Sequence, residues 1–306
     1  MKAWRLEGFG GALALKDIPL PEVRPGSVLV RIQASPLLSY LKQYVEGKLT
    51  FYNPPPGAFT PGTNGVGVIE AVGRDVWHFE PGQRVVLSPH YVAGENVEDP
   101  AQILIGLTAF GVGSAAVQAD WRDGSLAEYM LAPVAAITPL DGLDSHDAAQ
   151  LAVLNRFIVP FGGLLRGRLV AGETLVVNGA TGAFGTAAVL LGIAMGAAHV
   201  VAAGRNQAAL EALVRAAGRR VVPVRLAGDV ATDAASLRAA AGGGAEIAFG
   251  QFMYPAGAYR RLIGLLRSGL LDIGAIRPLR FPLAALPDAM EAAASASSLE
   301  CVVMQP

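Results

Sequence analysis

A short glycine-rich segment has the residue types and spacing that suit phosphate binding. It has the sequence GATGAFG and follows the strand pattern LVVN, in which three of the four residues are apolar. Glycines at this spacing after a strand allow a tight turn, close approach of the backbone to a phosphate, and close packing of helix on strand. The N–H groups and the dipole at the start of the next helix favour a pyrophosphate. The alternative is a turn needed only for packing. The predicted contacts are Gly179, Ala180, Thr181, Gly182, Ala183, Phe184 and Gly185.

The residues after the next apolar segment indicate which dinucleotide is bound. Sites for NAD typically carry an acidic residue about 20 residues after the loop, where it binds the ribose hydroxyls. This sequence has Gly204, Arg205 and Asn206 there, and no acid. A carboxylate would repel a 2′-phosphate, whereas the guanidinium of Arg205 can clamp one through charge-assisted hydrogen bonds. We therefore predict NADP(H) as the cofactor, bound partly by these three residues. A solvated arginine at a strand end is the alternative.

The segments around the glycine loop alternate between strand and helix patterns. Strand patterns cover 173–178, 199–204, 220–226 and 245–250, and helix patterns cover 145–167, 183–195, 206–218 and 231–243. Ser145 is a suitable N-cap for the first of these helices. Strands that alternate with helices indicate a parallel sheet with helices on both faces. The glycine loop is then the connection between a strand and a helix.

The first 90 residues have a β-rich pattern instead. Alternating, β-branched segments at 27–34, 65–73 and 83–89 are separated by Pro-Gly turn signals. Residues 91–120 are rich in small residues and are expected to be irregular, and 124–133 returns to a strand pattern. The sequence thus predicts an α/β protein with a β-rich first part. Near the C-terminus it predicts helices over 257–271 and 281–295 and a strand over 300–306.

Charge and cysteine content exclude several classes of function. The chain has 24 Lys+Arg and 25 Asp+Glu without a block of like charge, so we expect no nucleic-acid or membrane partner. Cys301 is the only cysteine, which rules out an internal disulfide and a zinc site of clustered thiolates. Histidines stand at 78, 90, 146 and 199, with no metal-binding spacing. We therefore expect no bound metal.

One apolar run is long enough to be considered as a membrane span. Residues 182–204 contain only Thr186 and His199 besides apolar residues and glycine, and they are long enough to span a membrane. By this criterion no other part of the sequence qualifies. Glycines at 196 and 204 divide the run into helix, turn and strand, which favours a buried unit of a parallel sheet. The N-terminus shows no secretory signal, and we expect a cytoplasmic protein.

Several segments resemble the medium-chain dehydrogenase/reductase superfamily, especially its zinc-independent quinone oxidoreductase-like members. The similar segments are 1–35, PGTNGVGVIEAVGRDVWHFEPGQRVV at 61–86, DGSLAEYMLAP at 123–133, the glycine loop, and FPLAALPDAMEAAAS at 281–295. The resemblance implies a GroES-like β-rich domain over 1–140, a Rossmann-type domain with a doubly wound parallel sheet over 141–268, and a C-terminal return to the first domain over 269–306.

The resemblance also identifies where zinc ligands would stand. The three ligands of the catalytic zinc in the zinc-dependent branch fall near Leu38, at Thr63 and near Val153. None of these side chains can serve as the expected cysteine or histidine ligand. The segment that would hold the four-cysteine structural zinc site, 91–120, has no cysteine. We therefore expect chemistry without zinc.

Direct hydride transfer to a quinone or an α,β-unsaturated carbonyl is the reaction that the resemblance then implies. Some zinc-independent relatives use a tyrosine donor, and Tyr52 lies nearest that place, with Tyr40 and Tyr44 close by in sequence. Asn64 and the pair His90-Tyr91 are other candidate donors. A polar Asn-Pro dipeptide of the resembled enzymes is Leu38-Ser39 here. We predict Tyr52 and Asn64 as catalytic residues, although packing roles explain them equally well.

The partner implied is a small, apolar carbonyl or quinone substrate. A homodimer is one assembly that the resemblance allows. The alternative function is a non-catalytic NADPH-binding or scaffold protein. It is suggested by an apparent shortening, because a strand–helix–strand unit of the resembled fold is missing near 249–251.

Overall fold

A computed structural model describes residues 1–242 and 254–306, and its residue contacts divide the chain into two units. The first unit comprises Met1–Ala152, Pro278–Ala296 and Val302–Pro306, and the second comprises Val153–Arg277 and Ser297–Cys301. The chain therefore enters the second unit after Ala152 and returns to the first at Pro278. The boundaries expected from the sequence were 140/141 and 268/269. Residues 297–301 form a second, short segment of the second unit.

The first unit is built on a largely antiparallel sheet around β3 (Ser27–Pro36). This strand pairs with β4 (Gly65–Val72), β9 (Tyr129–Pro133) and β15 (Glu300–Gln305). Strand β3 is buried on both faces, with Arg31 as its exposed residue, as its β-branched sequence suits. The sheet order is β10-β5-β4-β3-β15-β14, with β5 at Arg84–Leu87, β10 at Ile137–Pro139 and β14 at Arg277–Pro282.

Shorter elements complete the first unit. They are β1 (Lys2–Leu6), β2 (Leu13–Asp17), β6 (His90–Val92), β7 (Gln102–Leu104), β8 (Thr108–Phe110), α1 (Leu41–Val45), α2 (Ala115–Asp120), α3 (Ala148–Ala152), α9 (Leu286–Ser295), and the 3₁₀ turns η1 (Val112–Ser114), η2 (Val134–Ala136) and η3 (Leu283–Ala285). The expectation that 91–120 is irregular is wrong, because β7, β8 and α2 lie there. Three-residue strands are too short to show a period of two, yet Ile103 and Ala109 reach the apolar core.

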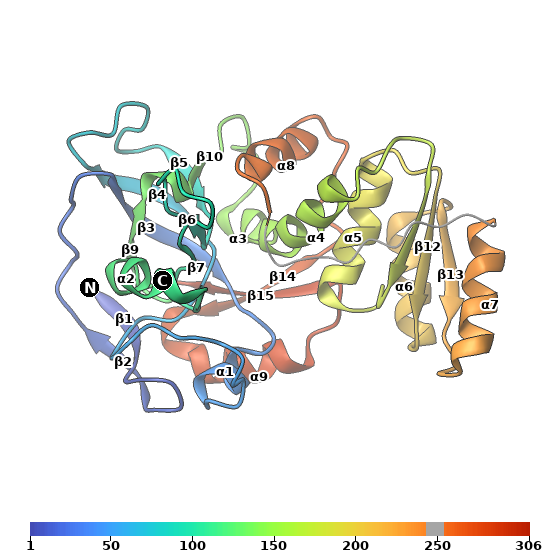
Figure 1. Cartoon of the computed structure of the whole chain (residues 1–306), viewed down its shortest axis with the longest axis horizontal. Coiled ribbons are helices and arrows are strands. Elements are labelled where there is room, and N and C mark those ends of the chain that lie inside the picture. The colour runs from blue at the N-terminus through green and yellow to red at the C-terminus, as the bar shows by residue number, and fades with distance from the viewer. Residues whose placement is uncertain (243–253) are drawn as a thin grey trace. The chain divides into compact units, whose positions relative to one another are not determined.

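The second unit contains the parallel sheet that the sequence predicts. β11 (Thr174–Asn178), β12 (His199–Gly204) and β13 (Val221–Arg225) pair in that order, all parallel. Helices α5 (Ala183–Ala194) and α6 (Gln207–Ala217) join a core with Val200, Ala202 and Val221 on one face. On the other face α7 (Val230–Ala241) packs against Val201, Ala203 and Val224. Figure 1 shows β12 and β13 side by side with α7 along them. The α/β prediction is confirmed.

The predicted strand at 245–250, and the missing unit near 249–251, lie outside the described residues. The second unit continues with α8 (Ala258–Arg267), which packs against α4 (Leu154–Arg166). Strand β14 was not predicted, since the expected helix over 281–295 covered part of it. Its six residues Arg-Pro-Leu-Arg-Phe-Pro include two prolines, which weaken any strand signal.

The predicted helix over 145–167 is interrupted at Val153, where α3 ends and α4 begins. Ser145 as N-cap is wrong. Asp147 and Gln150 form a reciprocal cap instead, because the Gln150 backbone N–H donates to Asp147 Oδ1 (2.9 Å) and the Asp147 N–H donates to Gln150 Oε1 (3.0 Å). This is the arrangement of a capping box. It places the start of the helix two residues later than the serine suggests.

The long apolar run is divided in the structure. Residues 182–204 form α5, a turn and β12, and not one helix. In the described part of the chain one helical stretch, Ala148–Arg166, is long and apolar enough to cross a membrane by length and composition. The statement that only 182–204 qualifies is therefore wrong. More than half of the apolar window in Ala148–Arg166 is buried, as in a core helix.

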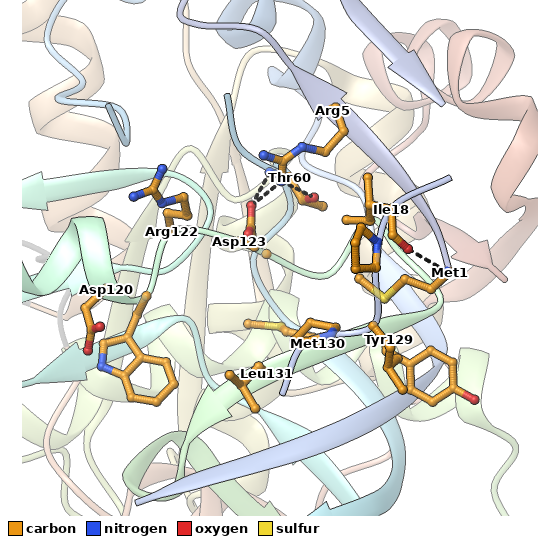
Figure 2. A pocket seen from close by; sticks show the side chains of 15 residues that line it. Met1, Arg5, Ile18, Thr60, Asp120, Arg122, Asp123, Tyr129, Met130 and Leu131 are labelled. Atoms are coloured by element: carbon orange, nitrogen blue, oxygen red, sulfur yellow. Dashed lines mark hydrogen bonds and ion pairs between the residues drawn. The ribbon is translucent and has the colours of Figure 1, made fainter. Parts of the chain in front are cut away.

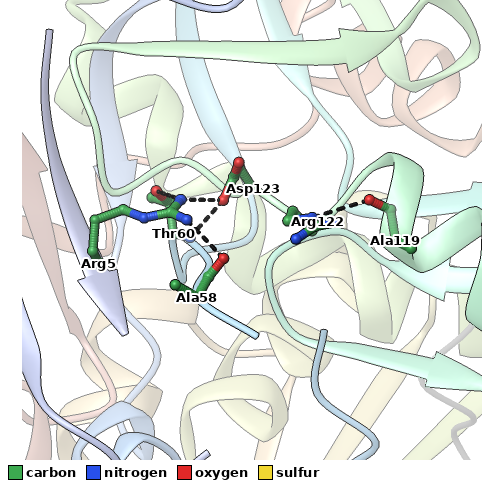
Figure 3. Close-up of polar contacts among 6 residues, drawn as sticks. All are labelled: Arg5, Ala58, Thr60, Ala119, Arg122 and Asp123. Atoms are coloured by element: carbon green, nitrogen blue, oxygen red, sulfur yellow. Dashed lines mark hydrogen bonds and ion pairs between the residues drawn. The ribbon is translucent and has the colours of Figure 1, made fainter. Parts of the chain in front are cut away.

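A partly buried ion pair between Arg5 and Asp123 connects β1, the segment 58–60 and the segment around Asp123 in the first unit (Figure 3). Arg5 of β1 donates to Asp123 Oδ1 (2.6 Å), to Thr60 Oγ1 (3.1 Å) and to the Ala58 carbonyl (2.6 Å). The Thr60 backbone N–H donates to the same Asp123 oxygen at 2.7 Å. The Arg5 side chain is 15% exposed, so this network is shielded from solvent more than an ordinary surface pair.

Replacing Asp123 by alanine is expected to lower the free energy of unfolding by about 1–2 kcal/mol, because two donors lose a charged acceptor. Asp123→Asn keeps one acceptor oxygen and should recover part of this loss. Asp17→Ala removes the exposed pair with Lys2 and should cost less than about 0.5 kcal/mol. Urea unfolding of the three variants measures this. Equal losses for Asp123→Ala and Asp17→Ala would contradict the assignment.

Candidate cofactor site

The glycine loop of the second unit connects the end of β11 to the start of α5. Gly179 has a φ of 71°, in the left-handed region that favours glycine. The loop is fixed to the neighbouring strand, because the Ala180 N–H donates to the Ala203 carbonyl of β12 at 2.8 Å. The Gly182 N–H closes the turn on the Gly179 carbonyl at 2.9 Å. The backbone conformation is thus set before any ligand binds.

Close packing in the first turn of α5 explains the third glycine. A Cβ at Gly185 would lie 2.1 Å from the Gly179 carbonyl oxygen, which is impossible without a backbone shift. Gly182 is the N-cap and makes no side-chain cap hydrogen bond. The N–H groups of Ala183 and Phe184 therefore stay outside the helical ladder and can bind an anion. The residues present fit a pyrophosphate.

Thr186 is a residue that the sequence analysis did not assign. It is fully buried, and its hydroxyl donates to the Ala180 carbonyl at 3.0 Å. This bond ties the helix to the loop from inside. The signal was present in the sequence, since Thr186 is the one hydroxyl-bearing residue in an otherwise apolar helix segment. A buried hydroxyl needs a hydrogen-bond partner, and here that partner is a carbonyl of the loop.

The end of β12 lies against the loop. A Cβ at Gly204 would meet the Thr181 side chain at 2.8 Å, so glycine is needed there as well. Arg205 is exposed directly beyond the strand. The Asn206 carboxamide accepts the Ala209 N–H (3.1 Å) and caps α6. The structure therefore brings the loop, Gly204 and Arg205 to one edge of the sheet, and gives Asn206 a role in fixing the turn.

The second unit is distinctly basic. All 13 of its Lys and Arg residues are arginines, against seven Asp and Glu. The near-neutral net charge of the whole chain hides this, because the first unit carries the excess of carboxylates. A local excess of positive charge favours anionic ligands. It agrees with a phosphate-bearing cofactor in this unit.

Tyr52 belongs to an aromatic cluster in the first unit. Its ring stacks on Tyr40 with a centroid distance of 6.0 Å and meets Tyr44 edge-on at 5.4 Å. Burial raises the pKa of Tyr52, and a hydrogen bond from Tyr40 offsets part of this rise. The Tyr44 hydroxyl donates to the Leu107 carbonyl within the core. Tyr52 is therefore half-buried and protonated at neutral pH, whereas Tyr44 is a core residue.

Asn64 lies in a different environment of the first unit. It is 3% exposed, and its backbone carbonyl oxygen lies within hydrogen-bond distance of the hydroxyls of Ser125 (2.7 Å) and Ser35 (3.2 Å). The two serine hydroxyls also bond to each other at 2.6 Å. Asn64 is thus held by a buried hydroxyl network, and Tyr52 by an aromatic cluster. In the third candidate, the pair His90-Tyr91 of β6, the Tyr91 ring packs edge-on against Trp121.

The positions of the expected zinc ligands do not fit a metal. Val153 and Thr63 are buried, and Leu38 packs at the edge of an apolar cluster. The Thr63 hydroxyl has no hydrogen-bond partner among the described residues. Over residues 1–242 and 254–306, no group of three or more His, Cys, Asp or Glu could hold a metal ion. We derive no chemistry through zinc from these residues.

A surface pocket of about 480 Å³ lies elsewhere in the first unit (Figure 2). Arg5, Thr60 and Asp123 form one wall, and Ile18, Leu131 and Met130 contribute apolar contacts. None of the predicted catalytic or cofactor residues lines it. Its polar wall is the structural network described above. We therefore assign it no part in the candidate site.

Comparison with known proteins now gives the family. Residues 24–142 match the family described as alcohol dehydrogenase GroES-like domain. An alcohol dehydrogenase of Moraxella sp. (strain TAE123) is 30% identical over 206 residues, which are 64% of this chain and 56% of the relative. A quinone oxidoreductase of Lama guanicoe is 29% identical over 196 residues, covering 61% and 48%. The matches span less than two thirds of the length of these curated relatives.

Solved structures agree on the fold. A cobalt- and zinc-bound thermostable alcohol dehydrogenase from Pyrobaculum aerophilum superposes with a TM-score of 0.72 at 21% identity, covering 100% of this chain and 99% of that one. A structure described as a zinc-binding dehydrogenase from Sinorhizobium meliloti 1021, bound to NADP, gives 0.71 at 20% identity, with 100% and 99% coverage. At such identities the likeness concerns the fold. Together the matches place the chain in the medium-chain dehydrogenase/reductase superfamily, as the sequence resemblance indicated.

Replacing Gly185 by alanine is expected to weaken nucleotide binding at least tenfold and to destabilise the second unit, because the Cβ cannot be placed beside the Gly179 carbonyl. Gly264→Ala in α8 is the matched control, since a Cβ there meets nothing within 4 Å. A helical Gly→Ala change in open space should stabilise by about 0.5–1 kcal/mol. Thermal unfolding and titration with NADPH measure both effects. Similar behaviour of the two variants would refute the close-packing argument.

Proposed function

We propose that the protein is a zinc-independent, NADPH-dependent oxidoreductase that reduces a quinone or an α,β-unsaturated carbonyl. The observation that carries the proposal is the preformed glycine loop beside a strand end that bears Arg205 and no carboxylate. When bound, reduced nicotinamide would supply a hydride, and the chain supplies binding, orientation and proton donation. The quinone oxidoreductase relative supports this class of reaction. A protein of similar fold, described as a zinc-binding dehydrogenase, is bound to NADP, which bears on the cofactor and not on the reaction.

The cofactor preference rests on electrostatics at the end of β12. A guanidinium at Arg205 attracts a 2′-phosphate, and an acid in its place would repel it. The exposed position of Arg205 leaves its donors available for this contact. In the part of the chain that is described, Arg205 forms no ion pair that would compete.

The donor set argues for an acceptor that needs no metal activation. Leu38, Thr63 and Val153 carry no side chain that completes the expected zinc site. Quinones and conjugated carbonyls accept a hydride when a hydrogen-bond donor stabilises the developing oxyanion. Tyr52 is the donor we propose, because burial raises the pKa of its phenol and keeps it protonated at neutral pH. Asn64 is proposed as a second polar contact for the substrate.

NADPH oxidation should accelerate with a panel of quinones and enones, and NADH should be a poorer reductant. Arg205→Ala is expected to raise the Kd for NADPH at least tenfold with little change for NADH, because the 2′-phosphate loses its cation. Steady-state kinetics and cofactor titration test this. Equal affinity for the two cofactors in the parent protein would contradict the cofactor assignment. Tight NADPH binding without turnover on any acceptor would instead favour the non-catalytic alternative.

Tyr52→Phe is expected to lower kcat about 100-fold or more while leaving the Kd for NADPH unchanged, as is typical for loss of a general acid. Burial raises the pKa of Tyr52, so the proton-bearing form persists below and through its usual value of about 10. The rate should therefore stay level between pH 7 and pH 9. Tyr129→Phe, in β9, is the control. A rate that falls between pH 6 and pH 8 would point to a histidine as the acid.

A further inference from the structure

A second arginine lies beside the cofactor edge of the sheet. In the parallel pairing of β12 with β13, Arg225 is the residue in register with Gly204. The Leu226 N–H donates to the Gly204 carbonyl at 2.9 Å and fixes this register beyond the end of the pairing. Because neighbouring strands lie about 4.8 Å apart, Arg225 is a near neighbour of both Gly204 and Arg205. The sequence analysis did not single it out.

The pleat of the sheet gives the direction of Arg225. Residues in register on neighbouring strands project to the same face. The Cβ direction at Gly204 points to Thr181 of the glycine loop, at 2.8 Å from its methyl group. Val221, four residues before Arg225 on the same face, belongs to the core that includes α5 and α6. Arg225 therefore leaves the sheet on the face that carries the loop.

Neither guanidinium is neutralised within the protein. Arg205 and Arg225 are both exposed, and neither side chain takes part in an ion pair or hydrogen bond within 1–242 and 254–306. The carboxylates that follow β13 are used otherwise. Asp233 accepts the backbone N–H groups of residues 227 and 228 at 2.7 and 3.0 Å, and Asp229 accepts the Thr232 N–H at 2.8 Å. Two exposed guanidinium groups without a counter-ion inside the protein leave their donors available to an anion.

We infer that Arg225 is a second cation for the 2′-phosphate of NADP(H), acting together with Arg205. The inference rests on the proposed cofactor preference and adds a residue from a different strand. A phosphate monoester carries a charge of about −1.5 to −2 at neutral pH and three acceptor oxygens. It can therefore accept from two guanidinium groups at once. Arg205 lies in the bend that follows β12, so the pleat does not set the direction of its side chain, and the positions of the two arginines at adjacent strand ends suit such a bridge.

Adenosine 2′,5′-bisphosphate and adenosine 5′-monophosphate are the probes, because they differ by the 2′-phosphate alone. Arg225→Ala should raise the Kd of the bisphosphate about tenfold, which corresponds to about 1.4 kcal/mol, and change that of the monophosphate less than twofold. Arg225→Lys should restore part of the loss. The double variant with Arg205→Ala should lose less than the product of the two single effects, because both cations bind one group. Calorimetric titration of the full chain measures all of these.

Arg219→Ala is the matched control. Arg219 is exposed and stands before the other end of β13, roughly 20 Å along the strand direction at about 3.3 Å per residue. It removes the same charge, so a general electrostatic effect would appear equally in both variants and overturn the inference. If the parent protein binds both probes equally, the proposed cofactor preference fails, and this inference with it. If the parent prefers the bisphosphate and Arg225→Ala keeps that preference, the role of Arg225 alone is overturned.

Discussion

The contact between the first turn of α5 and the glycine loop constrains how the helix packs on the parallel sheet of the second unit. Gly185 approaches the Gly179 carbonyl so closely that no side chain fits. This approach sets how closely α5 packs on β11 and β12, and so the depth of the apolar core below them. It also leaves the helix start open, because Gly182 brings no side chain to cap it. One packing constraint thus produces both the layered unit and an anion-binding end.

The second unit could be predicted well from the sequence because its signals are local. The boundaries of β12 agree with the predicted 199–204, and α5 differs by one residue. Long apolar runs broken by glycine leave few alternatives for such segments. The first unit was harder, since β6, β7 and β8 are three-residue strands held by long-range pairing. Strand β14 shows the same difficulty. It pairs with β15, but its two prolines weaken the strand signal in the sequence.

The residues of the candidate site also fall into those set by local sequence and those set by long-range pairing. The loop and the end of β12 could be located from spacing alone, since a strand–loop–helix order brings them together. Arg225 could not, because its relation to Gly204 depends on the register of two strands. Asn206 illustrates a second difficulty. Its type suits a ligand contact and a helix cap equally, and hydrogen bonding shows that it caps α6. The roles of Thr186 and Asp147 likewise became clear only from the hydrogen-bond partners of their side chains.

The exclusive use of arginine in the second unit has a consequence for how this protein responds to its surroundings. A lysine changes its charge when burial or neighbours shift its pKa, whereas a guanidinium keeps its charge at any pH that the fold tolerates. The contribution of these arginines to the attraction of an anion therefore hardly depends on pH. Dissolved salt has much more, since exposed charges are screened over about 8 Å at physiological ionic strength. The positive charge of these arginines is thus constant with pH, whereas the distance over which it acts depends on salt.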